Sequence, residues 1–262
     1  MAFSSENATI SPFSRNNPMK QNLFLLTVMI FALSSVLSAA EPVIKRPFNG
    51  TNLDGWNIRA GSNVNCWTVG TFEANAMTLE AQPLRAGARG YMLNNLGADW
   101  RDARPRRGID IYTEEKFGDC TIKLEFLITR GSNSGVYLMG EYEVQIHDSF
   151  GKADDTLHQG DMGAIYSAAA PATNAAKEPG VWQTMEIEFV APRFDAQGNK
   201  IASALFKRVV LNGVLIQENI EVRAPTGGGL TMREAATGPL MFQGTHGPVA
   251  FRNIEVIVPQ GE

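Results

Sequence analysis

Four polar residues alternate with apolar ones between positions 141 and 147, and their types suit chemistry on a ligand. Successive side chains of a β-strand point to opposite faces of the sheet. A strand over residues 142–146 therefore presents one polar face, made of Glu141, Glu143, Gln145 and His147. Carboxylate, amide and imidazole groups in one row, with no Lys among them, can hold sugar hydroxyls or transfer protons. The alternative is a strand whose polar face simply meets water, as is ordinary in antiparallel sheets.

A strand of this kind must be held in place by a turn and by neighbouring strands. Residues 134–139 are predicted to form the preceding strand, and Met139-Gly140-Glu141 the turn. Alternation of apolar and polar side chains predicts two long strands, at residues 119–128 and 184–190. We expect their inward side chains to be buried between two sheets, namely Ile122, Leu124, Phe126, Met185, Ile187 and Phe189.

Short strands separated by turn residues are predicted along the rest of the chain. They cover residues 66–69, 77–80, 90–94, 163–166, 205–211, 214–217, 240–244 and 249–258. Asn212-Gly213 between two of them is the strongest local signal for a hairpin. Residues 95–117, 192–200 and 226–238 are predicted to be loops. Since no long amphipathic helix is evident, the sequence predicts an all-β fold, a two-sheet antiparallel jelly-roll sandwich.

Composition and the N-terminal sequence bear on location and partners. The chain has 262 residues, 44% of them hydrophobic, and a net charge of −4, which fits one domain and gives no support to nucleic-acid binding. Lys20, the apolar run at 23–37 and the small residues before Glu41 are typical of a secretory signal peptide. We therefore predict a signal peptide with an upstream extension in residues 1–40 and a single β-sandwich domain in residues 41–262. The mature protein is expected to be periplasmic or secreted, without stable insertion in a membrane.

Seven short motifs occur in order along the chain. They are Phe48-Asn-Gly-x-x-Leu-Asp-Gly-Trp56, Asn133-Ser-Gly135, Tyr142-Glu-Val-Gln-Ile146 with Asp148, Gly163-Ala-Ile-Tyr166, Gly180-Val-Trp182, Leu211-Asn-Gly213 and Gln243-x-x-His-Gly-Pro-Val-x-Phe-Arg-Asn-Ile254. With these motifs the chain resembles the 3-keto-disaccharide hydrolase domain family over about residues 44–258. The resemblance implies a sandwich of the concanavalin A-like lectin/glucanase type. It also implies action on a carbohydrate substrate, a glycoside oxidised to a ketone at C3.

The chain departs from the family's pattern at several points. Residues 95–117, 192–204 and 223–238 are longer than the family leads us to expect, and His147 stands where an apolar residue is expected. These departures bear on the size of the substrate and on details of the site. The fold expected from the resemblance is unaffected.

A ketone at C3 makes the proton on C2 acidic, so a general base can remove it and the group at C1 can then leave. Elimination, or elimination followed by addition of water, cleaves the glycoside. Such a site needs a base, a group that stabilises the enolate oxygen and an acid for the leaving group. The catalytic residues that the motifs suggest are Glu143 as the base, together with His246 and Asp148.

Further polar residues of the motifs are expected to bind the substrate. They are Asn133, Gln145, His147, Tyr166, Gln243 and Arg252. Several have a simpler alternative: Asn133 as a turn residue, Tyr166 as a core residue and Arg252 as the partner of an acid in the sheet. His147 could also be a local variation, and His246 an ordinary turn histidine.

The sequence assigns no cofactor. Glu, Asp and His side chains on adjacent strands could hold a divalent metal, calcium or another, that polarises the ketone. Tight ligand spacing such as His-x-x-x-His is absent, however. Cys66 and Cys120 either pair in an oxidising compartment or remain as two buried thiols.

Three functions from different classes fit these residues. The first is a secreted enzyme that cleaves 3-keto-glycosides. The second is a non-catalytic carbohydrate-binding module on the same fold, since lectins and glycosidases share it. The lack of exposed aromatic residues along the site strand favours the enzyme. The third is a retaining glycosidase that uses Glu141 and Glu143, whose Cα atoms would lie about 6.5–7 Å apart.

Overall fold

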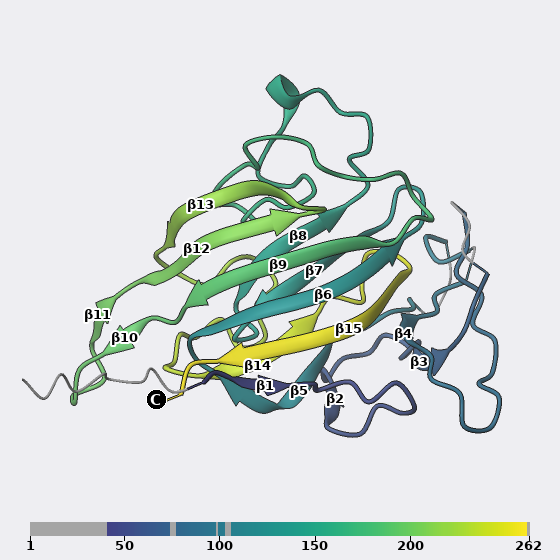
Figure 1. Cartoon of the computed structure of the whole chain (residues 1–262), viewed down its shortest axis with the longest axis horizontal. Helices are drawn as coiled ribbons and strands as arrows, with labels where there is room; N and C mark the ends of the chain where they lie inside the picture. The colour runs from purple at the N-terminus through teal and green to yellow at the C-terminus, as the bar shows by residue number, and fades with distance from the viewer. Residues whose placement is uncertain (1–40, 74–76, 98, 103–105, 261–262) are drawn as a thin grey trace, which may run out of the picture. The chain divides into compact units, whose positions relative to one another are not determined.

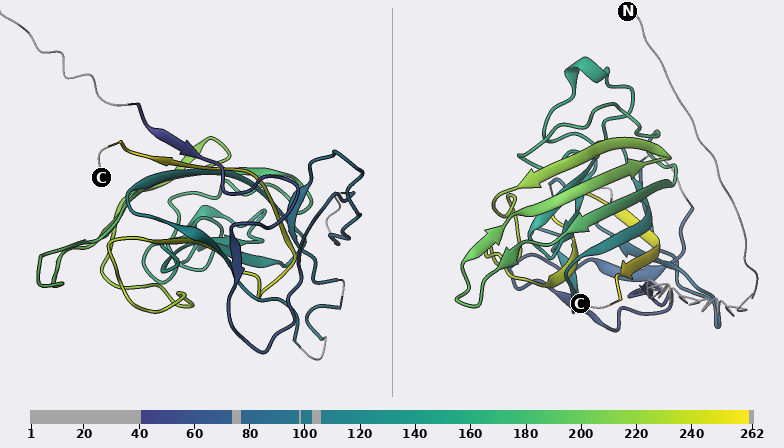
Figure 2. Two further views of the ribbon diagram at one scale, coloured as in Figure 1. Left: turned by 90° about the horizontal axis from the view of Figure 1, so that it is seen from below. Right: turned by 60° about the vertical axis from the view of Figure 1, so that its left-hand side comes forward.

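The described residues form two antiparallel sheets that pack face to face (Figure 1; Figure 2). The computed structural model describes residues 41–73, 77–97, 99–102 and 106–260. The two-sheet, all-β sandwich predicted from the sequence is confirmed. The predicted signal peptide in residues 1–40 lies outside the described residues. No helix in the described part of the chain has the length and apolarity that crossing a membrane requires.

The larger sheet has eight strands, seven of them in the order β13-β12-β9-β6-β15-β4-β3. Their bounds are β3 Trp67–Gly70, β4 Tyr91–Asn94, β6 Cys120–Ile128, β9 Gln183–Val190, β12 Ala204–Leu211, β13 Val214–Val222 and β15 Val249–Val258. The eighth strand, β1 (Val43–Lys45), pairs with the end of β15. This sheet supplies one wall of the core, and its other face points away from the smaller sheet.

The smaller sheet has five strands in the order β2-β5-β14-β7-β8. Their bounds are β2 Trp56–Ile58, β5 Ile111–Phe117, β7 Asn133–Leu138, β8 Tyr142–His147 and β14 Gly238–Phe242. The β7–β8 hairpin therefore forms one edge of this sheet, and the polar residues of β8 lie on it. Outside the two sheets, β10 (Arg193–Phe194) pairs with β11 (Lys200–Ala202), and η1 (Asp154–Thr156) is a short 3₁₀ turn.

The core between the sheets is built from the alternating residues of the long strands. All six side chains predicted to be buried there are at most 3% exposed, from Ile122 on β6 to Phe189 on β9. An aromatic stack crosses the core, because Phe242 of β14 and Phe251 of β15 lie with their ring centroids 4.0 Å apart. Trp56 stacks on Phe242 from the smaller sheet. Such pairs contribute about 0.5–1.5 kcal/mol beyond the area that they bury.

The predicted Asn212-Gly213 hairpin is confirmed between β12 and β13. Both residues have positive φ, 53° for Asn212 and 84° for Gly213. A two-residue turn that matches the right-handed twist of the strands needs this conformation, which Asn and Gly adopt at low cost.

Four sequence predictions about secondary structure are wrong. Residues 77–80 form no strand; Leu79 instead packs on the outer face of the larger sheet, against Leu93 and Leu127. Residues 163–166 form no strand; Ile165 makes isolated bridges to Val144 and to Ala169. The end of the predicted 95–117 loop is β5, and residues 192–200 contain β10 and the start of β11. The strand β5 acquires its pairing from the distant strands β2 and β14, which local patterns do not encode.

The two cysteines are free thiols, Cys66 half-buried and Cys120 buried. Burial raises the pKa of the Cys120 thiol to about 12, with a smaller contribution from the neighbouring Asp119 carboxylate. Cys120 is therefore protonated and behaves as a small core side chain.

Candidate active site

The register of the β7–β8 hairpin brings the polar residues of the two strands together. Tyr137 lies opposite Glu143, Gly135 opposite Gln145, and Asn133 opposite His147. The alternate residues of β8, namely Tyr142, Val144 and Ile146, point into the core and are fully buried. The hairpin thus carries one apolar and one polar face, as the sequence predicts.

The polar face of β8 is covered rather than wet. Glu143 is only 2% exposed and Gln145 only 3%. Residues 163–166 run along the free edge of β8, where Tyr166 N donates to Glu143 O and Gln145 N donates to Ala164 O. Buried polar side chains on a sheet face are costly unless a partner satisfies them, so their retention points to a site.

A second cover is the segment 226–230, which we call the strap. Its two ends hydrogen-bond to the turn before β8, because Thr226 N donates to Glu141 O and Leu230 N to Gly140 O. The Thr226 hydroxyl accepts from Glu143 N at 3.0 Å. The Tyr137 hydroxyl donates to Gly227 O at 3.0 Å. These hydrogen bonds hold the strap across the polar face, above Glu143.

Arg59, the residue directly after β2, holds the middle of the strap. Its guanidinium donates to the carbonyl oxygens of Gly228 and Gly229, at 2.9 and 3.0 Å. The same group pairs with the buried Asp110 carboxylate at 2.9 Å. Asp110 in turn accepts a hydrogen bond from Gly244 N, so one ion pair links the strap to the segment after β14.

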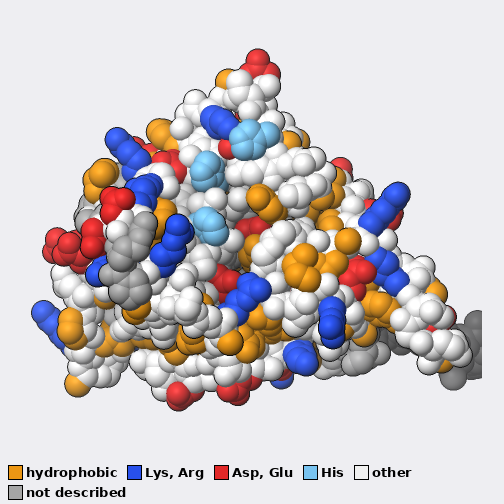
Figure 3. All heavy atoms as spheres, turned by 180° about the vertical axis from the view of Figure 1, so that it is seen from behind, with side chains coloured by type: hydrophobic (Ala, Val, Ile, Leu, Met, Phe, Trp, Pro, Cys, Tyr) orange, Lys and Arg blue, Asp and Glu red, His pale blue; other side chains and the backbone are white. Residues whose placement is uncertain are grey.

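A cavity of about 240 Å³ remains between β7, β8, the strap and the residues after β14. It is lined by Asn133, Tyr137, Glu143, Gln145, Tyr166, Gly227, Gly228, Gln243 and His246. Six of the nine residues expected to form the site line it, although their roles stay predictions. Figure 3 shows the side of the smaller sheet, where the three histidines of the chain lie in a row.

Three buried oxygens of this cavity have no hydrogen-bond partner among the described residues. They are Oε1 of Glu143, Oε1 of Gln145 and Oε1 of Gln243. An unsatisfied buried acceptor costs about 1–3 kcal/mol. Three of them facing one small cavity form a constellation that hydroxyl or other donor groups of a ligand would satisfy.

Burial raises the pKa of the Glu143 carboxyl to about 8. A hydrogen bond from the Tyr137 hydroxyl pulls in the opposite direction, and the Asp110 carboxylate adds to the upward shift. The Tyr137 hydroxyl carries one proton, which it shares between Glu143 and Gly227 O. Burial also raises the pKa of Tyr137, so this hydroxyl stays protonated. Glu143 is thus a carboxyl able to take or give a proton near neutral pH.

His246 contributes the exposed wall of the cavity. Its Nδ1 lies 2.6 Å from the Thr245 hydroxyl, and its carbonyl oxygen accepts from Asn133 N. These contacts fix the bend that carries the imidazole beside β7, within reach of a ligand in the cavity.

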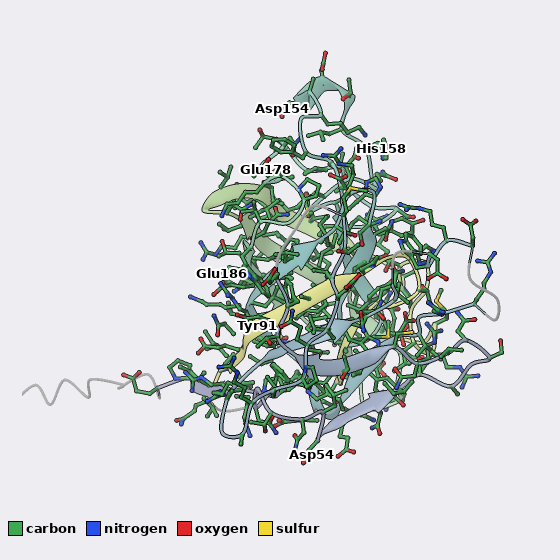
Figure 4. All side chains as sticks on the ribbon, turned by 90° about the vertical axis from the view of Figure 1, so that its right-hand side faces the viewer. Asp54, Tyr91, Asp154, His158, Glu178 and Glu186 are labelled. Carbon is green, nitrogen blue, oxygen red and sulfur yellow. The ribbon has the colours of Figure 1, made fainter. Side chains whose placement is uncertain are left out.

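Three expected site residues lie elsewhere. Asp148 accepts a hydrogen bond from Gly131 N at 2.8 Å, and thereby closes the loop before β7. Arg252 belongs to the larger sheet, where it pairs with Glu125 at 2.6 Å and stacks over Trp182 at 4.0 Å. Its neighbour Tyr91 lies on the outer side of that sheet in Figure 4. Neither Asp148 nor Arg252 lines the cavity, because the position of a side chain depends on the strand or loop that its motif joins.

His147 lies on the polar face but outside the cavity lining. The glycosidase reading with Glu141 and Glu143 as a carboxylate pair also does not fit. Both oxygens of Glu141 accept hydrogen bonds, from Thr231 N, the Thr231 hydroxyl and Met232 N. Glu141 therefore anchors the loop after the strap and does not face the cavity.

Sequence reasoning missed Tyr137, Arg59 and the strap glycines. Tyr137 could have been found, because it lies on the same face of β7 as Asn133 and Gly135. Arg59 and the strap carry no such pattern, since they meet only in the folded chain. Among the described residues, no three His, Cys, Asp or Glu side chains gather in a way that could hold a metal ion.

Residues 44–257 match the family model of the 3-keto-alpha-glucoside-1,2-lyase-like domain. The chain belongs to this family. No protein of curated function matches this chain.

Solved structures of three proteins from Parabacteroides distasonis, each provisionally named a glycosyl hydrolase, share the fold. One is 25% identical over 83% of this chain and 83% of its own, with a TM-score of 0.54. Another is 19% identical over 82% of this chain and 98% of its own, with a TM-score of 0.50. The family match and these structures agree with the two-sheet sandwich fold of this chain.

Proposed function

We propose that this family member cleaves glycosides whose sugar ring carries a ketone at C3, with Glu143 as the general base. The observation that carries the proposal is the set of three unpartnered buried oxygens around one small cavity, one of them on a carboxyl with a pKa of about 8. A single sugar ring offers hydroxyl donors for the amide oxygens and an acidic C–H for the carboxylate.

The reaction follows from the acidity of C2. The Glu143 carboxylate removes the C2 proton, and the electron pair moves into an enolate with its charge on the C3 oxygen. The enolate then reforms the ketone as a C1–C2 double bond forms and the C1–O bond breaks. The departing oxygen takes a proton, and addition of water across the double bond completes a net hydrolysis.

Residues of this chain are available for each remaining task. The protonated Tyr137 hydroxyl lies beside Glu143 and, by turning its proton from Gly227 O, can donate to the enolate oxygen, which is the kind of stabilisation that contributes most to such reactions. His246, on the exposed wall, is suited to protonate the leaving oxygen. The Gln145 and Gln243 side chains, with Asn133, are suited to hold the ring hydroxyls.

The test is incubation of the purified protein with 3-keto-trehalose and with unoxidised trehalose, with sugar release followed by mass spectrometry. Only the keto substrate should be cleaved. Glu143→Gln should lower turnover by about 10²–10⁴-fold, because a positioned base contributes that much. Glu114→Gln is the matched control, since Glu114 is an exposed carboxylate on β5 of the same sheet. It should retain full turnover.

The other outcomes select other functions. Binding of sugar without release of product from any keto substrate would replace the enzyme by a carbohydrate-binding module. Full turnover of Glu143→Gln would exclude Glu143 as the base. A parallel reaction with a chelator, followed by re-addition of a divalent ion, tests whether a metal assists.

A further inference from the structure

The cavity is closed at one end along β8. Moving from Glu143 towards the start of the strand, the next side chain on the polar face is Glu141, whose carboxylate is held by Thr231 and Met232. The strap crosses the face at this point, with Gly229 so close that a Cβ there would collide with the Glu141 carboxylate. A ligand ring beside Glu143 therefore meets the strap on this side.

A separate hollow lies beyond the strap on the same face of the sheet. It has a volume of about 420 Å³ and is lined by residues such as Tyr112, Glu114, Leu230 and Arg233. No residue lines both this hollow and the Glu143 cavity. Arg59 and Tyr137 hold the strap in place between the hollow and the cavity. A saccharide chain therefore cannot continue from the cavity into the hollow.

On the opposite side of the cavity, the polar face of β8 continues to His147 at the end of the strand. Gln145 lines the cavity and His147 follows two residues later on the same face of β8. Two residues of a strand span about 6.6–6.8 Å, so His147 stands about 13 Å from Glu143 along the strand. That distance is longer than one sugar ring. It corresponds to the far side of a second ring attached to a first ring that lies beside Glu143.

His147 is held as a ligand-binding imidazole would be. Its Nδ1 lies 3.4 Å from the Ser149 hydroxyl and 3.8 Å from Oδ1 of Asp161. Asp161 is fully buried and is fixed by Lys152 at 2.7 Å. The Nε2 atom of His147 has no hydrogen-bond partner among the described residues, and the side chain is 36% exposed. A buried carboxylate behind one ring nitrogen orients the other towards a ligand.

We propose that this site binds only a terminal keto-sugar ring, seated against the strap, with the leaving sugar directed along Gln145 to a subsite formed by His147. The proposal rests on the proposed function and adds the orientation of the substrate in the site. It also gives a role to His147, which lies on the polar face but outside the cavity lining.

The experiment compares two substrates that share the keto ring, methyl 3-keto-glucoside and a 3-keto-disaccharide with a second glucose as the leaving group. His147→Ala should lower kcat/KM for the disaccharide about tenfold, as loss of one hydrogen bond does, and change the methyl glycoside far less. His147→Gln, which keeps a donor and an acceptor, should recover part of the loss. His158→Ala is the matched control, because His158 also lies near Asp161, at 3.5 Å, but on a loop and not on β8 (Figure 4).

Each outcome of this comparison supports or overturns a stated part of the proposal. Equal loss on both substrates, or no loss on the disaccharide, overturns the His147 subsite while the proposed function stands. Cleavage of a trisaccharide oxidised only on its middle ring overturns the closed end. If the wild type cleaves neither keto substrate, the proposed function itself fails, and the leaving-group subsite fails with it. Should His147→Ala fold poorly, the same comparison made with His147→Gln against His147→Asn carries the decision.

Discussion

The Glu143 carboxyl lies directly over the Cα of Gly135 on the neighbouring strand, so that a Cβ at position 135 would collide with Oε1, Cδ and Cγ of Glu143. The backbone of Gly135 does not have positive φ, so its conformation would suit any residue. Gly135 is therefore required for space and not for flexibility. The Asn133-Ser-Gly135 motif and the base on β8 form one arrangement, in which the missing side chain makes room for the carboxyl.

Gly135→Ala should displace the Glu143 carboxyl. We expect the free energy of unfolding to fall by about 1–3 kcal/mol, as for other overpacked sites. Turnover on a keto substrate should fall at least about tenfold, because a small misplacement of a base is costly. Thermal unfolding and initial rates measure the two effects.

The control for this prediction is a double-mutant cycle with Glu143→Ala, which removes the atoms that collide. Gly135→Ala should cost less stability in that background, with a coupling energy of about 0.5–3 kcal/mol. An equal cost in both backgrounds would show that the glycine is needed for another reason.

The pKa of Glu143 predicts how activity depends on pH. A base with a pKa of about 8 is mostly protonated at pH 6, so kcat/KM should rise about tenfold per unit up to about pH 8 and then level off. The measurement is a pH profile on a keto substrate, with the uncatalysed elimination subtracted. Glu143→Gln should lose this rise along with its rate. A profile that is flat between pH 6 and 9 would contradict the assignment.

The same raised pKa predicts an opposite trend in stability. Between about pH 4.5 and 8 the unfolded chain has released the Glu143 proton while the folded protein still holds it. The free energy of unfolding therefore falls as pH rises, by at most about 1.4 kcal/mol per unit from this group. Glu143→Gln removes the group, so its stability relative to wild type should rise from pH 5 to pH 9. Urea unfolding of both proteins at the two pH values measures this, with Glu114→Gln expected to follow the wild type.

Much of the fold could be predicted because its signals are local. Strict alternation predicts β6, β9 and the two faces of β8, and Asn212-Gly213 predicts the β12–β13 turn. The cavity residues on β8 could be predicted for the same reason. The strap and Arg59 could not, because their contacts join positions about 170 residues apart in the chain. That Asp148 and Arg252 lie outside the cavity could not be predicted either, because a motif gives residue types without the direction of each side chain.

Export remains a prediction from the sequence. The apolar run and the small residues that precede Glu41 are typical of a cleaved signal peptide, so the mature chain should begin near Glu41. Sequencing the N-terminus of the protein recovered from the periplasm or the medium measures this. Recovery of the chain in the membrane with residues 19–40 retained would contradict it.

Removing the Arg59 guanidinium should loosen the strap. Arg59→Met keeps part of the apolar stem but leaves the Asp110 carboxylate buried without its ion partner, and frees the carbonyl oxygens of Gly228 and Gly229. We expect the free energy of unfolding to fall by about 1–3 kcal/mol and KM for a keto substrate to rise. Hydrogen exchange at the Leu230 amide, which donates to Gly140 O at 2.7 Å, should become faster.

The control for the strap is Arg46→Met. Arg46 pairs with Glu255 at 2.6 Å, but its side chain is 61% exposed, and such surface pairs contribute at most about 1 kcal/mol. This variant should leave Leu230 exchange and KM unchanged, because Arg46 contacts neither the strap nor the cavity. If Arg59→Met instead behaves as Arg46→Met does, the strap is held by its hydrogen bonds to Gly140, Glu141, Glu143 and Tyr137 without the help of Arg59. The ion pair with Asp110 would then have no part in closing the cavity.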